Sequence, residues 1–151
     1  MADAIGTGAA DTVQLRFRDD PQVDHPAVTV DAFLDQTNAV AVRIEPGDDA
    51  RDLLAHLDRI ALVEVNFPVY GDGRGFSSAS ILREAGYTGE LRAVGDVLVD
   101  RIDAMRRCGF DSFKPNTPLD DGDVAAAFAR WPEVYQATTD GRVPIWALRH
   151  G

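Results

Sequence analysis

Hydrophobic and polar positions follow two rhythms along the chain, and their alternation predicts strands and helices in turn. Short apolar runs, typical of buried strands, are followed by segments whose apolar residues recur every three or four positions, as on one helix face. The predicted strands cover residues 13–17, 39–44, 60–65, 91–97, 110–113 and 134–138, and the predicted helices cover residues 30–34, 48–58, 78–85, 98–107 and 123–130. Four successive strand-to-helix steps predict a parallel sheet with helices packed on it.

Two α/β architectures satisfy this order: an open, doubly wound sheet, and half of a (βα)₈ barrel that another subunit completes. We favour the open sheet. A tight turn at Asp140-Gly141 predicts a hairpin that adds an antiparallel edge strand. In both architectures ligands gather at the carboxyl ends of the strands, where residues 66–76, Asp96 and residues 111–115 are expected.

Length and charge limit the classes of protein that the chain can represent. Residues 1–12 predict a flexible N-terminus, and residues 13–151 predict one α/β domain, because 151 residues of which 45% are apolar suffice for one core. A formal net charge of −10 opposes binding to nucleic acid or to an anionic membrane. Because no apolar run approaches the roughly 20 residues of a membrane span and no signal peptide is evident, we expect a cytoplasmic protein.

A glycine-rich segment, residues 70–78, lies between the predicted strand 60–65 and the helix that follows it. Glycines let the main chain approach a ligand, the first N–H groups of a helix lack internal partners, and Arg74 adds a positive charge. This pattern predicts an anion site that comprises Gly73, Arg74, Gly75, Ser77 and Ser78. The alternative is a turn in which Arg74 pairs with Asp72 or Asp96. In both cases we expect Ser77 or Ser78 to cap the helix.

The strand 91–97 contributes two further candidate residues. Alternation places Arg92 on the face opposite Leu91, and Asp96 falls at the strand end, where a carboxylate could hold Mg²⁺, accept a proton or cap the next helix. The cap is the favoured role for Asp96. If the protein is an enzyme, Asp72 and Asp96 are the candidate bases, and no catalytic residue is otherwise assigned.

Cofactor chemistry is restricted by the single cysteine, Cys108, which excludes an internal disulfide and a four-cysteine iron–sulfur cluster. Arg106, Arg107 and Gly109 have the pattern of a helix C-terminus, so Cys108 is predicted to be an inert packing group. The three histidines lack metal-ligand spacing, and the glycines at 71, 73 and 75 lack the dinucleotide spacing. We therefore expect no metal and no cofactor.

Three blocks together carry a family resemblance: GDGRGFS at 71–77, LREAGYTGELRAVGD at 82–96 and RCGFDSF at 107–113. In order and spacing they resemble the bacterial family called domain of unknown function 934, over most of residues 38–138. The pair Tyr135-Gln136 also fits. The family pattern has Asp-Gln where this chain has Asp100-Arg101, so any role of that glutamine side chain does not carry over.

The resemblance implies a place in sulfur metabolism. Family members are commonly encoded beside assimilatory sulfite reductase and phosphoadenylyl-sulfate reductase and are often labelled oxidoreductases of sulfite reduction. Sulfite reduction uses sirohaem and an iron–sulfur cluster, which one cysteine cannot hold. We therefore expect an accessory protein that binds an anionic metabolite or a reductase partner through Gly73, Arg74, Ser77, Arg92 and Asp96.

Two alternatives stay open beside the accessory role. One is an enzyme that acts on a phosphorylated or sulfur-containing metabolite, with Asp72 or Asp96 as its base and Arg74 as its anion clamp. The other is a structural interaction module. The expected partners are a small anion and sulfite reductase or another sulfur-assimilation enzyme, and the oligomeric state is left open.

Overall fold

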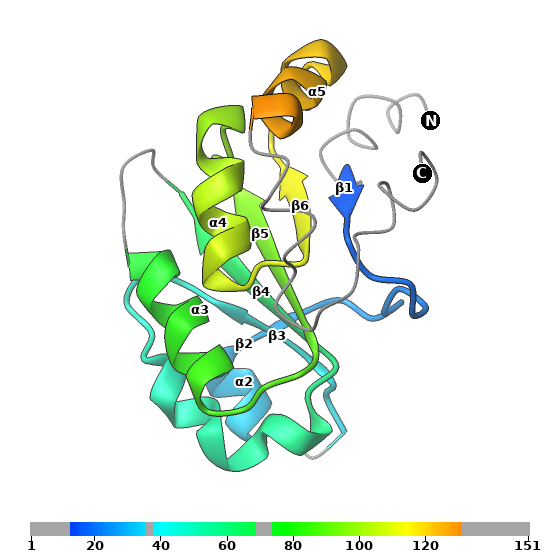
Figure 1. Cartoon of the computed structure of the whole chain (residues 1–151). Helices are drawn as coiled ribbons and strands as arrows, with labels where there is room; N and C mark the ends of the chain where they lie inside the picture. The colour runs from blue at the N-terminus through cyan, green and yellow to red at the C-terminus, as the bar shows by residue number, and fades with distance from the viewer. Residues whose placement is uncertain (1–12, 36–37, 69–73, 131–151) are drawn as a thin grey trace.

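The structure of the protein, a computed structural model, describes residues 13–35, 38–68 and 74–130 (Figure 1). Its strands are β1 (Leu15–Arg16), β2 (Val28–Thr29), β3 (Ala41–Ile44), β4 (Leu62–Phe67), β5 (Glu90–Gly95) and β6 (Ser112–Pro115). Its α-helices are α2 (Val30–Asp35), α3 (Arg74–Glu84), α4 (Ile102–Cys108) and α5 (Asp121–Arg130), and its 3₁₀ helices are η1 (Ala50–Arg59) and η2 (Val99–Arg101). The predicted strand 134–138 and the hairpin at Asp140-Gly141 lie outside the described residues.

The strands form one sheet of six in the order β1-β6-β5-β4-β3-β2. β2 to β6 are parallel to their neighbours and β1 pairs antiparallel with β6. The predicted open, mostly parallel α/β sheet is confirmed. The parallel strands β2 to β6 stand in the sheet in the same order as in the chain. Among the described strands the order therefore never reverses, and there is no switch point at which a ligand crevice would form.

The hydrophobic core lies on the sheet face that the helices cover. Alternate residues of the central strands point to this face, and all of them are buried: Val42, Ile44, Val63, Val65, Phe67, Leu91, Ala93 and Phe113. In α3 the buried positions are Gly75, Ser78, Ala79 and Leu82, whose spacing of three and four forms one stripe along a helix. α3 packs against β4, η1 and α4, and Figure 1 shows α3 and α4 in front of the strands.

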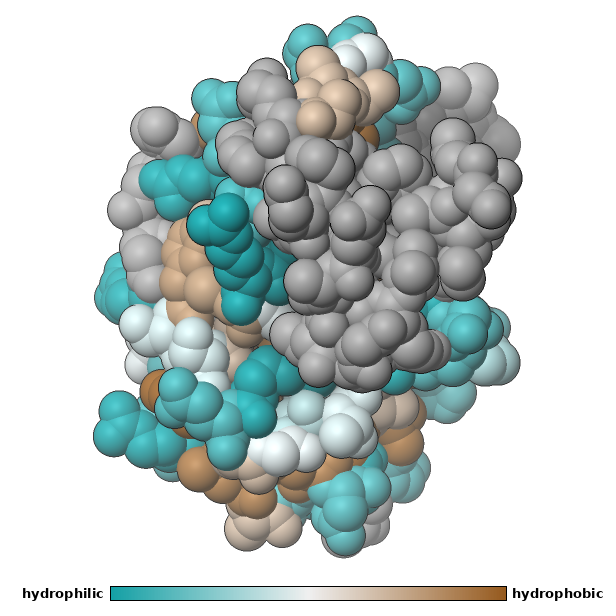
Figure 2. Space-filling view, viewed as in Figure 1, coloured by the Kyte–Doolittle hydropathy of each residue, from teal (hydrophilic) through white to brown (hydrophobic). Residues whose placement is uncertain are grey.

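Exposed apolar side chains lie at the opposite end of the molecule from α5. The described large hydrophobic residues with the greatest exposure are Leu34 of α2 and Leu54 of η1, at 43% and 37%. Figure 2 shows apolar side chains gathered at the end where α2 and η1 lie, and hydrophilic side chains along much of the remaining coloured surface.

Candidate functional site

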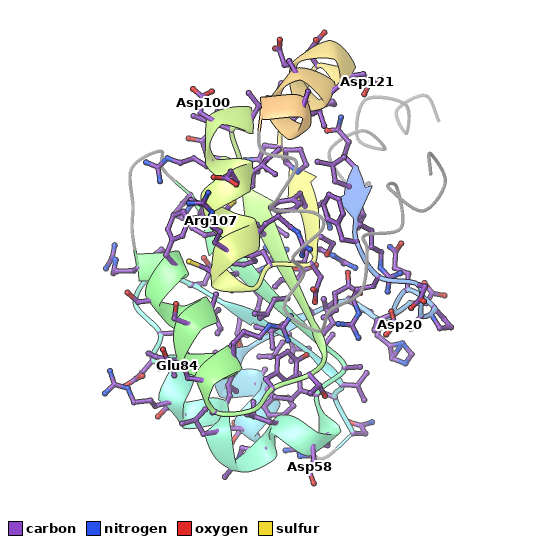
Figure 3. All side chains as sticks on the ribbon, viewed as in Figure 1. Asp20, Asp58, Glu84, Asp100, Arg107 and Asp121 are labelled. Carbon is purple, nitrogen blue, oxygen red and sulfur yellow. The ribbon has the colours of Figure 1, made fainter. Side chains whose placement is uncertain are left out.

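Arg74, the charged residue of the predicted anion site, lies at the carboxyl edge of the sheet, the edge where β3 to β6 end. In Figure 3, Asp100 and Asp121, which follow β5 and β6, mark this edge. Arg74 is exposed there as the first residue of α3. Gly73 and Asp72 lie outside the described residues. Arg74 is thus held by an eleven-residue helix whose first turn starts just beyond β4.

Gly75 is explained by packing between α3 and β4. A Cβ atom at this position would lie 2.5 Å from Cζ of Phe67, closer than real Cβ contacts come, and 3.1 Å from Cγ1 of Val65, tighter than most of them. The helix backbone therefore rests directly on the Phe67 ring, and only glycine permits that approach. The glycine fixes the start of α3 at the edge, whereas its own surface faces the core.

The two serines of the motif lie inside α3, so the predicted cap is wrong. The helix begins at Arg74, ahead of both residues, because the packing of Gly75 on Phe67 brings the first turn onto the sheet. Ser78 is buried on the same stripe as Gly75, and Ser77 is exposed one turn into the helix. Of the two serines, Ser77 is the one that a ligand at the edge can reach.

Asp96 is half-buried where β5 ends, and main-chain hydrogen bonds hold it in place. Its N–H donates to the Phe67 carbonyl at 2.7 Å, and the Asn116 N–H donates to the Gly95 carbonyl at 2.8 Å, so the ends of β4, β5 and β6 are joined. The N-cap of η2 is Leu98, without a side-chain bond, so the predicted capping role of Asp96 is wrong. Its carboxylate forms no hydrogen bond with any residue that the structure describes.

Asn66 and Glu45 form a hydrogen-bonded pair at the same edge, and this pair was not predicted from the sequence. Asn66 donates from Nδ2 to Oε1 of Glu45 at 2.7 Å, and the Glu45 N–H donates to Oδ2 of Asp48 at 2.8 Å. Asn66 is the penultimate residue of β4 and Glu45 directly follows β3. The available signal was a polar residue at the end of each of two successive predicted strands.

A row of charged and polar side chains crosses the sheet face opposite the helices. Arg43, Glu64, Arg92, Ser112 and Arg16 are direct partners on β3, β4, β5, β6 and β1. We call these five residues the polar row. The row lies in the middle of β4 and β5, so the structure does not bring Arg92 to Arg74 at the carboxyl edge, and Arg92 has a separate environment.

Arg92 is the centre of a buried hydrogen-bond network. Its Nε donates to Oγ of Ser112 at 3.2 Å, its Nη1 donates to Oε2 of Glu64 at 3.3 Å, and its Nη2 donates to Oε2 of Glu90 at 3.1 Å. The side chains of Arg92, Glu64 and Glu90 are 5%, 6% and 2% exposed. Each of these charges is thus compensated inside the protein, which is the condition for burying ions at tolerable cost.

The hydrogen-bond network favours the ionised form of the Glu90 carboxylate. Burial alone would raise the pKa of Glu90, but hydrogen bonds from Arg16 and Ser112 and the nearby Arg92 charge outweigh burial and hold the pKa below its ordinary value. The Ser112 hydroxyl donates to Glu90 at 2.6 Å and Nη2 of Arg16 donates to it at 2.9 Å. The carboxylate is therefore ionised throughout the neutral range.

Asp111 lies at the amino end of the sheet, which corrects its expected place at the carboxyl edge, because β6 begins only at Ser112. Its Oδ2 accepts from Nη2 of Arg83 at 2.6 Å and from Nη1 of Arg18 at 3.0 Å. Arg83 also donates to the main-chain carbonyls of Tyr87, Gly89 and Gly109. One arginine thus joins two of the motif blocks, 82–96 and 107–113, so much of their pattern has a structural explanation.

The predicted C-terminus of α4 is confirmed. Gly109 has φ 111° and its N–H donates to the Arg106 carbonyl at 3.0 Å, while the Phe110 N–H donates to the Met105 carbonyl at 3.1 Å. Cys108 is half-buried and packs against the core.

Two features are absent from the part of the chain that the structure describes. No group of three or more His, Cys, Asp or Glu side chains there could hold a metal ion. Within the same residues, no helix has the length and apolar character that a membrane span requires.

Comparison with known proteins adds one match. The model of a family described as a bacterial protein of unknown function (DUF934) matches residues 41–146, from β3 to beyond α5. Comparison with curated proteins and with solved structures gives no match. The three motif blocks, at 71–77, 82–96 and 107–113, all lie inside the matched range.

Proposed function

The chain belongs to the bacterial DUF934 family, and from this premise we propose that it binds a small anionic metabolite at the carboxyl edge in support of sulfite or sulfate reduction. One observation carries the proposal: Arg74 opens α3 at this edge, and Gly75 seats the helix on Phe67 so that the position of the arginine is fixed. The first N–H groups of α3 and the guanidinium of Arg74 would face the anion together.

The geometry narrows the set of residues expected to touch the ligand. Arg74, Ser77 and Asp96 lie at or near the carboxyl edge, and Gly73 and Asp72 precede α3 in the chain. Gly75 and Ser78 face the core, so they support the site through packing. Arg74 matters because the chain has a net charge of −10, and an anion needs a local positive charge to approach it.

The place in sulfur metabolism is proposed from the family resemblance. The single cysteine, Cys108, cannot hold an iron–sulfur cluster, so the proposed role is to support a reductase with a metabolite or through contact. The proposed partner is sulfite reductase or another sulfur-assimilation enzyme, and the proposed location is the cytoplasm.

A thermal-shift series tests the anion proposal with sulfite, sulfate, adenylyl sulfate, phosphoadenylyl sulfate and reduced nicotinamides. A ligand at 100 times its Kd stabilises the native state by about 2.7 kcal/mol, which corresponds to roughly 5 to 10 °C in Tm. We expect Arg74→Ala to lose most of the shift. The control is Arg107→Ala, because Arg107 is exposed on α4 and its removal changes the net charge equally (Figure 3). Equal shifts in both variants would contradict the proposal.

Growth of a deletion strain tests the pathway. We expect the strain to grow poorly on sulfate and normally on cysteine. Wild type and Cys108→Ser should restore growth on sulfate, and Arg74→Ala should restore it poorly through loss of charge-assisted contacts. Normal growth of the deletion strain on sulfate as sole sulfur source would remove the pathway from the proposal.

An enzymatic role is the second candidate, favoured by the environment of Asp96. Its carboxylate lies at the carboxyl edge and is not used as a helix cap, so it is available as a base. If the protein turns over a phosphorylated or sulfur-containing metabolite, Asp96→Asn should abolish product formation and preserve the thermal shift. Mass spectrometry of the metabolite after incubation with each variant gives the measurement.

A further inference from the structure

The segment η1 (Ala50–Arg59) is a 3₁₀ helix of ten residues, whereas runs of such helix rarely exceed about three or four. The hydrogen bonds at both of its ends span three residues. The Asp52 N–H donates to the Asp49 carbonyl at 3.0 Å, and the Ile60 N–H donates to the Leu57 carbonyl at 3.3 Å. Because hydrogen bonds in a 3₁₀ helix have poorer geometry than those in an α-helix, a run of this length indicates that contacts with neighbouring elements hold the tighter winding.

The apolar residues of η1 follow the period of an α-helix. They are spaced as i, i+3, i+4 and i+7, which forms one face at 3.6 residues per turn: Ala50, Leu53, Leu54 and Leu57. In the 3₁₀ winding the first two are buried, but Leu54 is 37% exposed and Leu57 is half-buried. An α-helix over the same residues would bring Leu54 and Leu57 onto the face of Leu53.

The contacts that hold the 3₁₀ winding centre on Phe33 of α2. Residues three apart eclipse in a 3₁₀ helix, so His56 and Arg59 continue the row of Leu53. The guanidinium carbon of Arg59 lies 4.3 Å from the centroid of the buried Phe33 ring, and the His56 ring meets the same ring edge to face at 5.7 Å between centroids. In an α-helix Arg59 would lie about 120° around the axis from Leu53, so Leu53 could not stay in the core while Arg59 stacks on Phe33.

The contact between Arg59 and Phe33 also has an unfavourable component. Nη1 of Arg59 is buried and has no hydrogen-bond partner among the residues that the structure describes. A donor removed from water without a partner destabilises the state that buries it. The 3₁₀ winding is thus favoured by the ring contacts and opposed by this donor and by exposure of Leu54, and α winding would reverse all three effects.

A change of winding would act on the carboxyl edge, because that end of η1 has slack in the chain. Ten residues span about 20 Å as a 3₁₀ helix and about 15 Å as an α-helix. Shortly after η1, the Ala61 N–H donates to the Val40 carbonyl at 2.8 Å and the Ala61 carbonyl accepts from Glu90, so that end is tied into the sheet. Before η1 comes the turn at residues 45–49, where Gly47 is exposed and a Cβ atom would meet nothing within 4 Å.

We propose that η1 is a two-state segment, in which rewinding from a 3₁₀ helix to an α-helix moves the turn 45–49 by about 5 Å at the carboxyl edge. In the 3₁₀ form the turn stands beside Asn66, which donates to Glu45 at 2.7 Å, and the Glu45 N–H donates to Asp48 at 2.8 Å. In the α form the shorter helix draws residues 46–49 away from the edge. The segment is then a switch that opens this side of the edge, and it uses no residue of the proposed anion site.

Paired spin labels measure the winding in the whole protein. In a Cys108→Ser background, Arg51→Cys with Asp58→Cys places labels at two exposed positions seven residues apart in η1 (Asp58 is labelled in Figure 3). The positions are about 14 Å apart along the axis on different faces of a 3₁₀ helix, and about 10 Å apart on one face of an α-helix. Dipolar broadening distinguishes the two. The control is Ser77→Cys with Glu84→Cys, exposed positions with the same separation in α3, which should give only the α spacing.

Substitutions should move the equilibrium in both directions. Arg59→Ala removes the stacked cation and should raise the ratio of α to 3₁₀ form by about tenfold. His56→Ala should act in the same direction by a smaller factor. Adding Leu54→Gln to Arg59→Ala keeps helix propensity but removes the apolar side chain that α winding buries, so it should reverse most of the change. Arg107→Ala, on exposed α4 surface, is the control and should leave the spectrum unchanged.

Hydrogen exchange reports on the turn in the same variants. The Glu45 amide, which donates to Asp48, should exchange about tenfold faster in Arg59→Ala and return towards the wild-type rate when Leu54→Gln is added. If neither Arg59→Ala nor His56→Ala shortens the label separation, or if Leu54→Gln fails to reverse the shortening, the two-state inference is wrong. A shortened helix with an unchanged Glu45 exchange rate would overturn its link to the carboxyl edge.

Discussion

The amino end and the carboxyl edge of the sheet differ in whether the charged side chains named below are paired with other side chains. At the amino end Asp111 accepts from Arg83 and Arg18, and Glu90 accepts from Arg16. At the carboxyl edge Asp96 and Lys114 form no ion pair with the described residues. Paired charges hold strands and loops together, whereas charges that have no ion-pair partner among the described residues are available to a ligand. The difference matches the division found in parallel α/β enzymes, where one end of the sheet provides stability and the other carries function.

The largest expected effect comes from breaking the paired charges. Arg92→Met should lower the free energy of unfolding by about 3 to 5 kcal/mol, because it leaves Glu64 and Glu90 buried with fewer partners. Urea denaturation followed by circular dichroism gives the value. A loss below 1 kcal/mol would mean that the polar row is not a stabilising network.

The second largest effect is expected for Arg83→Met, which should lower the free energy of unfolding by about 3 kcal/mol. The substitution removes hydrogen bonds to three main-chain carbonyls and to Asp111. The matched control is Arg107→Met, because the Arg107 side chain is 62% exposed and its ion pair with Asp103 should be worth less than about 1 kcal/mol. Similar losses in both variants would show that Arg83 does not join the motif blocks in the way the geometry indicates.

Gly75→Ala tests whether packing fixes the start of α3. The added Cβ would lie 2.5 Å from Cζ of Phe67, so we expect the free energy of unfolding to fall by about 1 to 3 kcal/mol. Gly47→Ala is the control, because a Cβ at Gly47 meets nothing within 4 Å. The double variant Gly75→Ala with Phe67→Leu should recover part of the loss in denaturation experiments, and strict additivity would argue against direct contact.

The free energy of unfolding, measured as a function of pH, tests how much the paired charge of Glu90 stabilises the protein. Burial opposes ionisation, but the bonds from Arg16 and Ser112 leave the pKa of Glu90 below its ordinary value. The stabilisation is therefore present above the unfolded pKa and is lost as pH falls through the folded pKa. Between about pH 6 and pH 3, Glu90→Gln should lose stability less steeply than wild type. Glu84→Gln, on exposed α3 surface, should keep the wild-type slope (Figure 3).

The smallest effects on stability are expected at the carboxyl edge. Asp96→Asn and Lys114→Met should each change the free energy of unfolding by no more than about 0.5 kcal/mol, because neither side chain has an ion-pair partner to lose. Urea titration of both variants beside Arg92→Met measures the contrast directly. A loss above about 2 kcal/mol in either variant would break the distinction between the two ends of the sheet.

The sequence by itself determined the alternation of strands and helices from β3 to α5, the open α/β sheet and the end of α4, whereas the short strand β2 was not predicted. These features depend on local signals: the period of apolar residues sets helix or strand, and a glycine after two arginines suits the left-handed residue that ends a helix, as at Gly109. The sequence also predicted that Asn66 and Asp96 lie at one edge of the sheet, because parallel strands end together.

Only the tertiary structure decided which side chains meet. Ser78 faces the core because packing of Gly75 on Phe67 starts α3 before the serines, and Asp111 moves to the amino end because β6 begins after it. Arg92 joins the polar row, and Lys114 stands beyond that row, through the register of strands far apart in the chain. Register and strand order arise from long-range pairing and burial, and a shift of one residue would send each of these side chains to the other face.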